Sequence, residues 1–316
     1  MGERPVVAKA CLHMWEEPCI SGTRGSGAVF FSGCSLKCIF CQNHEISHGG
    51  LGKEITAEEL AAIFLSLRNK GAHNINLVSP THFVPAIKEA LELAKKGKAA
   101  EGLELPEGFE MENGPETTDG PETTDGPEST DRPESSDRLG VSEPLNIPIV
   151  YNTNGYDNME GLQILDGSID IYLPDLKYIS YDVSLKYSGA KDYFDNASKA
   201  ILEMYRQVGA PVFDENGIMQ RGMIIRHLVL PGYTNESLHV LDWIAENLPD
   251  DVYVSLMSQY IPCYLACGHP IIGRRLTMYE HEKVLNKFEK LGLNGFIQER
   301  DAASEEYIPD FNQMQF

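Results

Sequence analysis

The chain has 316 residues, of which 42% are hydrophobic and 9% aromatic, and this is enough apolar material for one large core. Its formal net charge of −21 repels phosphate backbones and argues against a protein that binds nucleic acid non-specifically. No apolar run approaches the roughly 20 residues that span a bilayer, and residues 1–10 lack the apolar segment of a signal peptide. We therefore expect a cytoplasmic protein that binds neither nucleic acid nor membrane.

The amino-terminal part of the chain alternates between strand and helix patterns. Residues 1–26 are interpreted as an N-terminal extension of a core that spans 27–300. Within the core, Thr56 followed by Glu59 three residues later is typical of a capping box at the start of a helix. The elements expected before residue 100 are strands over 28–32 and 75–79 and helices over 57–69 and 84–96.

Residues 101–144 differ in composition from the rest of the chain. Between Glu101 and Glu143 there are 14 acidic and two basic residues, and a hexapeptide recurs in four near-copies over residues 114–137. Each copy reads Gly or Arg, Pro-Glu, two Ser or Thr residues and Asp. Such a segment has too few apolar side chains to offset its ordering entropy. We expect a disordered acidic loop that stays out of the active site, with a phosphorylation or docking segment as the alternative.

The alternation resumes after this insertion and indicates an α/β fold. Strand followed by helix, repeated about six times, predicts a parallel sheet with crossover helices and with its chemistry at the carboxyl ends of the strands. The pattern alone does not separate an open sheet from a curled partial barrel. Residues 301–316 are interpreted as a C-terminal tail. The later elements are strands over 148–153, 169–173, 223–230, 252–257 and 295–298 and helices over 191–208, 237–247 and 278–291.

Three of the seven cysteines lie within eight residues, directly after the first expected core strand. Thiolates at Cys34, Cys38 and Cys41 can each bind one iron of a cubane and leave the fourth iron without a protein ligand. The alternative is a zinc-stabilised protein-binding module, in which His44 or His48 supplies the fourth zinc ligand. The spacing is unusual for zinc modules, so it favours an iron-sulfur cluster.

The spacing Cys-x3-Cys-x2-Cys, with Phe40 before the last cysteine, resembles the radical S-adenosylmethionine (SAM) superfamily. Residues 25–33 (GSGAVFFSG), 152–155 (NTNG) and 170–177 (DIYLPDLK) resemble pyruvate formate-lyase activating enzymes. Outside the acidic insertion, the chain is similar to an uncharacterised family related to these activators. The resemblance implies a partial (β/α)6 barrel and an oxidoreductase with a [4Fe-4S] cluster. It also implies SAM as the second cofactor, cleaved by one electron to methionine and a 5′-deoxyadenosyl radical.

The resemblance further implies partners and residue roles. A reductant such as flavodoxin or ferredoxin would supply the electron, and a glycyl-radical protein would lose a glycine Cα hydrogen, while another small-molecule or protein substrate stays open. The catalytic candidates, which would line the pocket as acids and bases, are Asp170, Asp175 and Lys177. The SAM-binding candidates are Phe40, Asn43, Ser79, Thr81, Asn154, Gly155 and Arg226. For Arg226 and the three catalytic candidates, an ion pair at a strand end is the alternative.

Four cysteines lie outside this motif: Cys11, Cys19, Cys263 and Cys267. They could hold a second cluster, as in some members of the superfamily, but free cysteines are often small buried apolar residues. We expect the second case.

Overall fold

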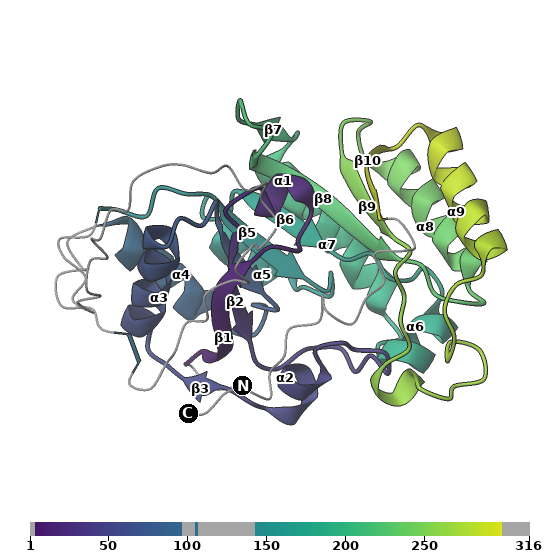
Figure 1. The fold of residues 1–316 in the computed structure, drawn as a ribbon, viewed down its shortest axis with the longest axis horizontal. Coiled ribbons are helices and arrows are strands. Elements are labelled where there is room, and N and C mark those ends of the chain that lie inside the picture. The colour runs from purple at the N-terminus through teal and green to yellow at the C-terminus, as the bar shows by residue number, and fades with distance from the viewer. Residues whose placement is uncertain (1–3, 97–104, 107–142, 299–316) are drawn as a thin grey trace, which may run out of the picture.

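The structure is a computed structural model that describes residues 4–96, 105–106 and 143–298. The four hexapeptide copies and residues 301–316, interpreted from sequence as a disordered loop and a tail, lie outside the described residues. Figure 1 shows the arrangement of the described elements around one sheet.

The strands form a single sheet in the order β10-β9-β8-β6-β5-β4-β2-β1-β3, with β7 paired to β8. From β2 to β10 along this order every neighbouring pair is parallel, which confirms the predicted α/β sheet. The parallel strands are β2 (Ser26–Phe31), β4 (Ile75–Val78), β5 (Ile149–Thr153), β6 (Ile171–Pro174), β8 (Met219–Leu228), β9 (Tyr253–Met257) and β10 (Asn294–Gln298).

The remaining strands were not predicted from sequence. β1 (Val6–His13) is antiparallel to β2, and β3 (Lys53–Glu54) is antiparallel to β1, so part of the expected N-terminal extension belongs to the sheet. The strand β7 (Val212–Phe213) forms an antiparallel pair with the start of β8. Because β1 is antiparallel and its His13 pairs with Ser26 at the start of β2, the loop after β1 begins at the amino-terminal edge of the parallel strands.

Helices follow most of the parallel strands. In Figure 1, α3 and α4 lie at the end of the sheet near β1 and β2, and α8 and α9 lie at the opposite end beside β9 and β10. Sequence periodicity predicted α3, α4, α7, α8 and α9, whereas the short helices α1, α2, α5 and α6 were missed. The helices are α1 (Pro18–Ser21), α2 (His44–Gly49), α3 (Ala57–Asn69), α4 (Val84–Lys95), α5 (Met159–Leu165), α6 (Tyr181–Ser188), α7 (Tyr193–Val208), α8 (Thr234–Asn247) and α9 (Met278–Leu291).

The two faces of the sheet have different partners because successive side chains of a strand point to opposite sides. One face packs against the helices and forms the main hydrophobic core, to which Phe31, Leu77 and Ile225 contribute. The neighbouring residues Phe30, Val78 and Ile224 belong to smaller clusters. The strands also carry buried polar side chains at positions adjacent in sequence to core residues, namely Asn76, Asn152 and Ser255.

Side chains of β2, β4, β5, β8 and β9 line one common cavity, so the sheet must curl around it. Within the described residues the sheet does not close on itself, since β10 and β3 are its two end strands. The predicted partial barrel is therefore confirmed as a curled, open α/β sheet. No helix in the described part of the chain is both long and apolar enough to cross a membrane.

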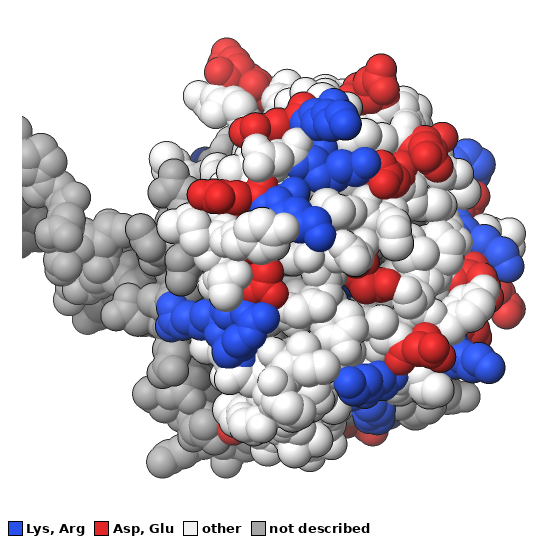
Figure 2. Space-filling model, turned by 90° about the vertical axis from the view of Figure 1, so that its right-hand side faces the viewer, with Lys and Arg blue, Asp and Glu red and all other residues white. Residues whose placement is uncertain are grey.

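The charge of −21 does not make every face acidic. Figure 2 views the side of the molecule on the right of Figure 1, where Lys and Arg are interspersed with Asp and Glu. Charges of both signs on one face offer no continuous positive field for a polyanion.

Candidate active site

The three motif cysteines lie on the loop between β2 and α2. The loop leaves the strand at Gly33, whose φ of 92° favours glycine, and the Gly33 N–H donates to the Ile46 carbonyl at 2.9 Å. Further along, the Lys37 N–H donates to the Ser188 carbonyl at 2.9 Å. These backbone contacts fix the loop between α2 and α6. All three cysteines line a single cavity with a volume of about 290 Å³.

Each of the three sulfur atoms has a polar side-chain neighbour from a different part of the fold. The side-chain amide of Asn154 donates to Cys34 Sγ at 3.2 Å, and Ser188 Oγ lies 2.9 Å from Cys38 Sγ. Ser47 Oγ on α2 lies 3.8 Å from Cys41 Sγ. Burial raises the pKa of Cys38 to about 12 and that of Cys41 to about 11, so a metal must displace their protons to bind the thiolates.

The side chains of Cys34, Cys38 and Cys41 are not arranged around a single ion in the described part of the chain. Among residues 4–96, 105–106 and 143–298, no three His, Cys, Asp or Glu side chains are placed to hold one metal ion. A cubane has no such requirement, because each thiolate binds a different iron. His44, a proposed zinc ligand, instead stacks on the Tyr264 ring with centroids 4.5 Å apart. The cavity shared by Cys34, Cys38 and Cys41 is therefore where the predicted cluster would bind.

A group of charged side chains that are only 11–17% exposed forms another part of the cavity wall. Arg226 on β8 donates from Nε to Asp175 at 3.0 Å, and Lys177 donates from Nζ to the other oxygen of Asp175. The Nη1 of Arg226 lies 3.4 Å from the carboxylate of Glu16, and its Nη2 donates to Asn152. All five side chains line the cavity. The predicted strand-end ion pair is thus present, but buried at the site.

The charges in this group keep one another ionised. Burial alone would raise the pKa of Asp175, but the charges of Lys177 and Arg226 outweigh it and lower that pKa. Burial alone would lower the pKa of Lys177, but the Asp175 carboxylate outweighs it and raises that pKa. A carboxylate and two cations therefore stay charged beside the cysteines at neutral pH.

The sequence profile described as the radical SAM superfamily matches residues 28–244 of this chain. The chain belongs to the radical SAM superfamily. An uncharacterized protein of Methanocaldococcus jannaschii is 29% identical over 293 residues, which cover 90% of this chain and 67% of that protein. Membership of this superfamily implies SAM and an iron-sulfur cluster as cofactors, in agreement with the cysteine loop.

Solved structures share the fold. A radical SAM methyltransferase from Sphaerobacter thermophilus superposes with a TM-score of 0.50 at 14% identity, covering 88% of this chain and 69% of that one. The radical SAM fold predicted from the cysteine motif is thus confirmed. SuiB of Streptococcus suis, solved with its precursor peptide SuiA, gives a TM-score of 0.49 at 15% identity over 86% of this chain. The present chain spans about half of the length of SuiB, 48%.

Several residues that the sequence assigned to SAM binding do line the cavity of this radical SAM protein. They come from the ends of different strands or from the loops that follow them, as the parallel sheet requires. Arg226 is among them, but three of its nitrogen atoms already bond to protein oxygens. The predicted SAM-binding residues on the cavity wall are Phe40, Asn43, Ser79, Asn154 and Arg226.

Two other predicted SAM-binding residues do not line the cavity. The Thr81 hydroxyl donates to the buried carboxylate of Asp157 at 2.9 Å, in the loop that follows β5. Gly155 has a φ of 81°, and a Cβ there would lie 2.2 Å from the Asp175 carbonyl oxygen. Thr81 and Gly155 therefore support the site from outside the cavity wall. Gly155 lets the ends of β5 and β6 approach closely.

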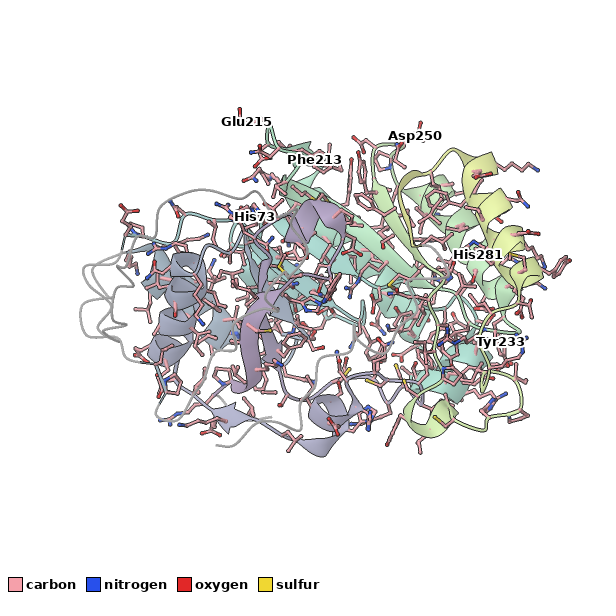
Figure 3. The ribbon with its side chains drawn as sticks, in the orientation of Figure 1. His73, Phe213, Glu215, Tyr233, Asp250 and His281 are labelled. Atoms are coloured by element: carbon pink, nitrogen blue, oxygen red, sulfur yellow. The ribbon has the colours of Figure 1, made fainter. Side chains whose placement is uncertain are left out.

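Asp170 is not brought to the site, which corrects its assignment as a catalytic residue of the pocket. It precedes β6, and its carboxylate accepts the N–H of Ile149 at the start of β5 with a length of 2.9 Å. Both atoms lie at the amino-terminal edge of the sheet. Three residues labelled in Figure 3 mark the two edges of the sheet. His73 and Asp250, just before β4 and β9, lie at the amino-terminal edge, and Tyr233, beyond the end of β8, lies at the opposite edge. The Asp170 carboxylate therefore helps to hold the start of β5 beside the start of β6.

Sequence reasoning missed Glu16 and Tyr193. Glu16 enters from the loop after β1 and accepts from the side chains of Asn76 and Asn152 at 3.1 and 3.2 Å. The only sequence signal for Glu16 was the pair of adjacent acids in His13-Met14-Trp15-Glu16-Glu17. The antiparallel strand before it, β1, gave no recognisable strand pattern. The Tyr193 hydroxyl lies 2.7 Å from the Asp175 carbonyl oxygen and accepts the Lys177 N–H at 3.0 Å. No sequence pattern distinguishes such a tyrosine from one in the core.

Proposed function

We propose that this chain cleaves SAM reductively at a [4Fe-4S] cluster held by Cys34, Cys38 and Cys41, and that the resulting radical removes hydrogen from a glycine Cα of a glycyl-radical protein. One observation carries the proposal: the three cysteines share a cavity with buried, oppositely charged side chains inside a curled radical SAM sheet. The bound cluster would supply the electron that breaks the sulfur to 5′-carbon bond of SAM. The chain's own residues would hold SAM in place and exclude water.

Lys177 is the cation best placed to receive the carboxylate of SAM. An ammonium has three donors, and Lys177 uses one of them on Asp175. Lys177 also lines the same cavity as the three cysteines. Arg226 has a different task, because its guanidinium is bonded to Asp175, Glu16 and Asn152. Arg226 balances the negative charges of the Asp175 and Glu16 carboxylates.

Phe40 supports the assignment of an apolar surface for the adenine ring. Its ring is buried and meets Tyr260 edge-on, with centroids 6.1 Å apart. An aromatic side chain that stacks on a nucleobase contributes roughly 1–3 kcal/mol in nucleic-acid complexes. The Phe40 backbone is held as well, because Cys263 Sγ donates to the Phe40 carbonyl at 3.2 Å.

The choice of a glycyl-radical protein as substrate rests on the resemblance to the activators. The cavity wall also includes Trp15, whose 52% exposure suits contact with a large partner, and the loop residues Gln259 and Ile261. A flavodoxin or ferredoxin is the proposed electron donor, and the cytoplasm is the proposed location. Radical modification of another small-molecule or protein substrate is the second candidate, since the same cavity would serve it.

The first experiment is anaerobic reconstitution with iron and sulfide, followed by dithionite and SAM and by chromatography of 5′-deoxyadenosine. We expect product from the wild type and from Cys267→Ala, an exposed thiol outside the cavity, and none from Cys34→Ala, Cys38→Ala or Cys41→Ala. A fully loaded wild type that forms no product with any reductant contradicts SAM cleavage.

The substrate is tested separately by incubation with glycyl-radical proteins of the source organism. A glycine-centred electron paramagnetic resonance (EPR) signal that depends on SAM and on the three cysteines is expected. If 5′-deoxyadenosine forms but no such signal appears with any of these proteins, the glycyl-radical assignment is wrong and SAM cleavage stands.

A further inference from the structure

A buried chain of hydroxyl groups ends on one cysteine of the motif. Tyr178, directly after Lys177, places its hydroxyl 2.8 Å from Ser188 Oγ, and Ser188 Oγ lies 2.9 Å from Cys38 Sγ. Ser188 is the last residue of α6, and both Tyr178 and Ser188 are 1% exposed. Cys38 is 8% exposed, the most buried of the three cysteines.

A cluster bound at Cys38 would fix the direction of these hydrogen bonds. A thiolate bound to iron has no proton, so it can only accept, and the Ser188 hydroxyl must donate to it. The Ser188 oxygen is then free to accept from the Tyr178 hydroxyl. The two bonds polarise each other in the same direction, toward the sulfur.

The side-chain donors at the other two cysteines are less well placed, although the backbone N–H of Leu36 also donates to Cys34 Sγ at 3.4 Å. Cys34 and Cys41 are half-buried. Ser47 Oγ is 3.8 Å from Cys41, a long contact, and Asn154, which donates to Cys34, is itself only partly buried. Cys38 is therefore the motif cysteine whose side-chain donor is both short and closed off from water.

We propose that Ser188 and Tyr178 are positioning residues that raise the reduction potential of the cluster through the sulfur of Cys38. This inference rests on the proposed function, because it requires the cluster. The reduced cluster carries one more negative charge than the oxidised cluster, so a buried donor to its sulfur ligand stabilises the reduced form more. An easier reduction would allow a weaker physiological reductant to start SAM cleavage.

The test is an EPR-monitored redox titration of the reconstituted full chain, with iron and sulfide content measured in parallel. In Ser188→Ala we expect the ratio of reduced to oxidised cluster at a fixed potential to fall about tenfold, which is about 59 mV for a one-electron couple. Ser184→Ala is the matched control: this serine is also buried on α6, but its hydroxyl donates to the Tyr181 carbonyl at 3.1 Å. Its potential should equal that of the wild type.

Tyr178→Phe gives an independent measurement that keeps the ring in place. We expect a shift in the same direction but smaller, because Ser188 still donates to Cys38 and loses only its polarising partner. If Ser188→Ala fails to load iron, Tyr178→Phe decides the question. Equal potentials in the wild type and in both loaded variants would overturn the inference while SAM cleavage stands. A wild type that never holds a cluster would instead defeat the proposed function.

Discussion

Asp170 and Asp175 lie at opposite ends of β6 and have opposite surroundings. Asp170 precedes the strand and accepts a backbone N–H of β5, a contact that holds two strands together. Asp175 follows the strand, lines the cavity and pairs with Lys177 and Arg226. Both acids occur in one short motif, and sequence analysis gave them the same role. In a parallel α/β sheet ligands bind at the carboxyl ends of the strands, so for these two acids the position along β6 decides the function.

The difference in bonding partners also changes what each carboxylate contributes. At the amino edge an amide could replace the Asp170 carboxylate and still accept the same N–H. At the carboxyl edge no neutral side chain can balance two buried cations at once. Mutations that compare the two ends therefore test the assignment of the site directly.

The largest difference is expected between Asp175→Asn and Asp170→Asn in the free energy of unfolding, measured with urea and circular dichroism. Asp175→Asn leaves Lys177 without its ion-pair partner and Arg226 with Glu16 alone, and removing one partner of a buried ion pair costs about 3–5 kcal/mol. Asp170→Asn keeps a hydrogen-bond acceptor and should cost about 1 kcal/mol. Equal losses would mean that the two ends of β6 are not distinct.

The pH dependence of folding sharpens the description of the carboxyl end. His227 bonds through Nδ1 to the Leu176 carbonyl, directly after Asp175, and burial lowers its pKa to about 4. In the unfolded chain the pKa is about 6.5, so the unfolded state binds the extra proton first as pH falls. The contribution of His227 is complete above pH 6.5 and is lost between 6.5 and 4, by about 2 kcal/mol at pH 5.

His227→Gln supplies the comparison for this titration, because glutamine does not ionise. Its loss of stability between pH 7 and pH 5 should be about 2 kcal/mol smaller than that of the wild type. If both proteins lose the same stability, His227 is not the group that titrates.

A smaller effect is expected for Lys177→Met on SAM binding, measured anaerobically by calorimetry with the loaded protein. Loss of one charge-assisted hydrogen bond should weaken binding about tenfold, or about 1.4 kcal/mol. Asp175 keeps its partner Arg226 in this variant, so the fold should survive. Lys186→Met, an exposed lysine on α6, is the control and should bind SAM normally. Equal affinities in both variants would remove Lys177 from the SAM site.

The smallest effect, none on SAM cleavage, is expected for deletion of residues 114–137. Their repeated Pro, Glu and Ser or Thr residues carry no apolar face that could pack on the core. A deletion that lowers the rate of 5′-deoxyadenosine formation would show that the insertion supports the site as well.

Sequence patterns were reliable where local physics decides the outcome. The bounds of α3 and α9 were predicted to the residue and those of α4 and α7 to within two residues, whereas α8 begins three residues earlier than predicted. Thr56 caps α3 with Glu59 in the expected capping box. Short elements were missed, because α2, α5 and α6 offer too few turns for periodicity to show. β1 was missed because it is stabilised by its pairing with β2, which no local pattern reveals.

The sequence by itself determined the superfamily, because the spacing of Cys34, Cys38 and Cys41 lies within one loop and is typical of the superfamily. It also determined the alternation of strand and helix, since side-chain periodicity is local. Only the tertiary structure decided that Asp175 faces the cavity and Asp170 does not, and that Glu16 and Ser188 reach the site from distant segments. Such contacts depend on which strands are neighbours and how the sheet curls, and neither is encoded in any single stretch of the chain.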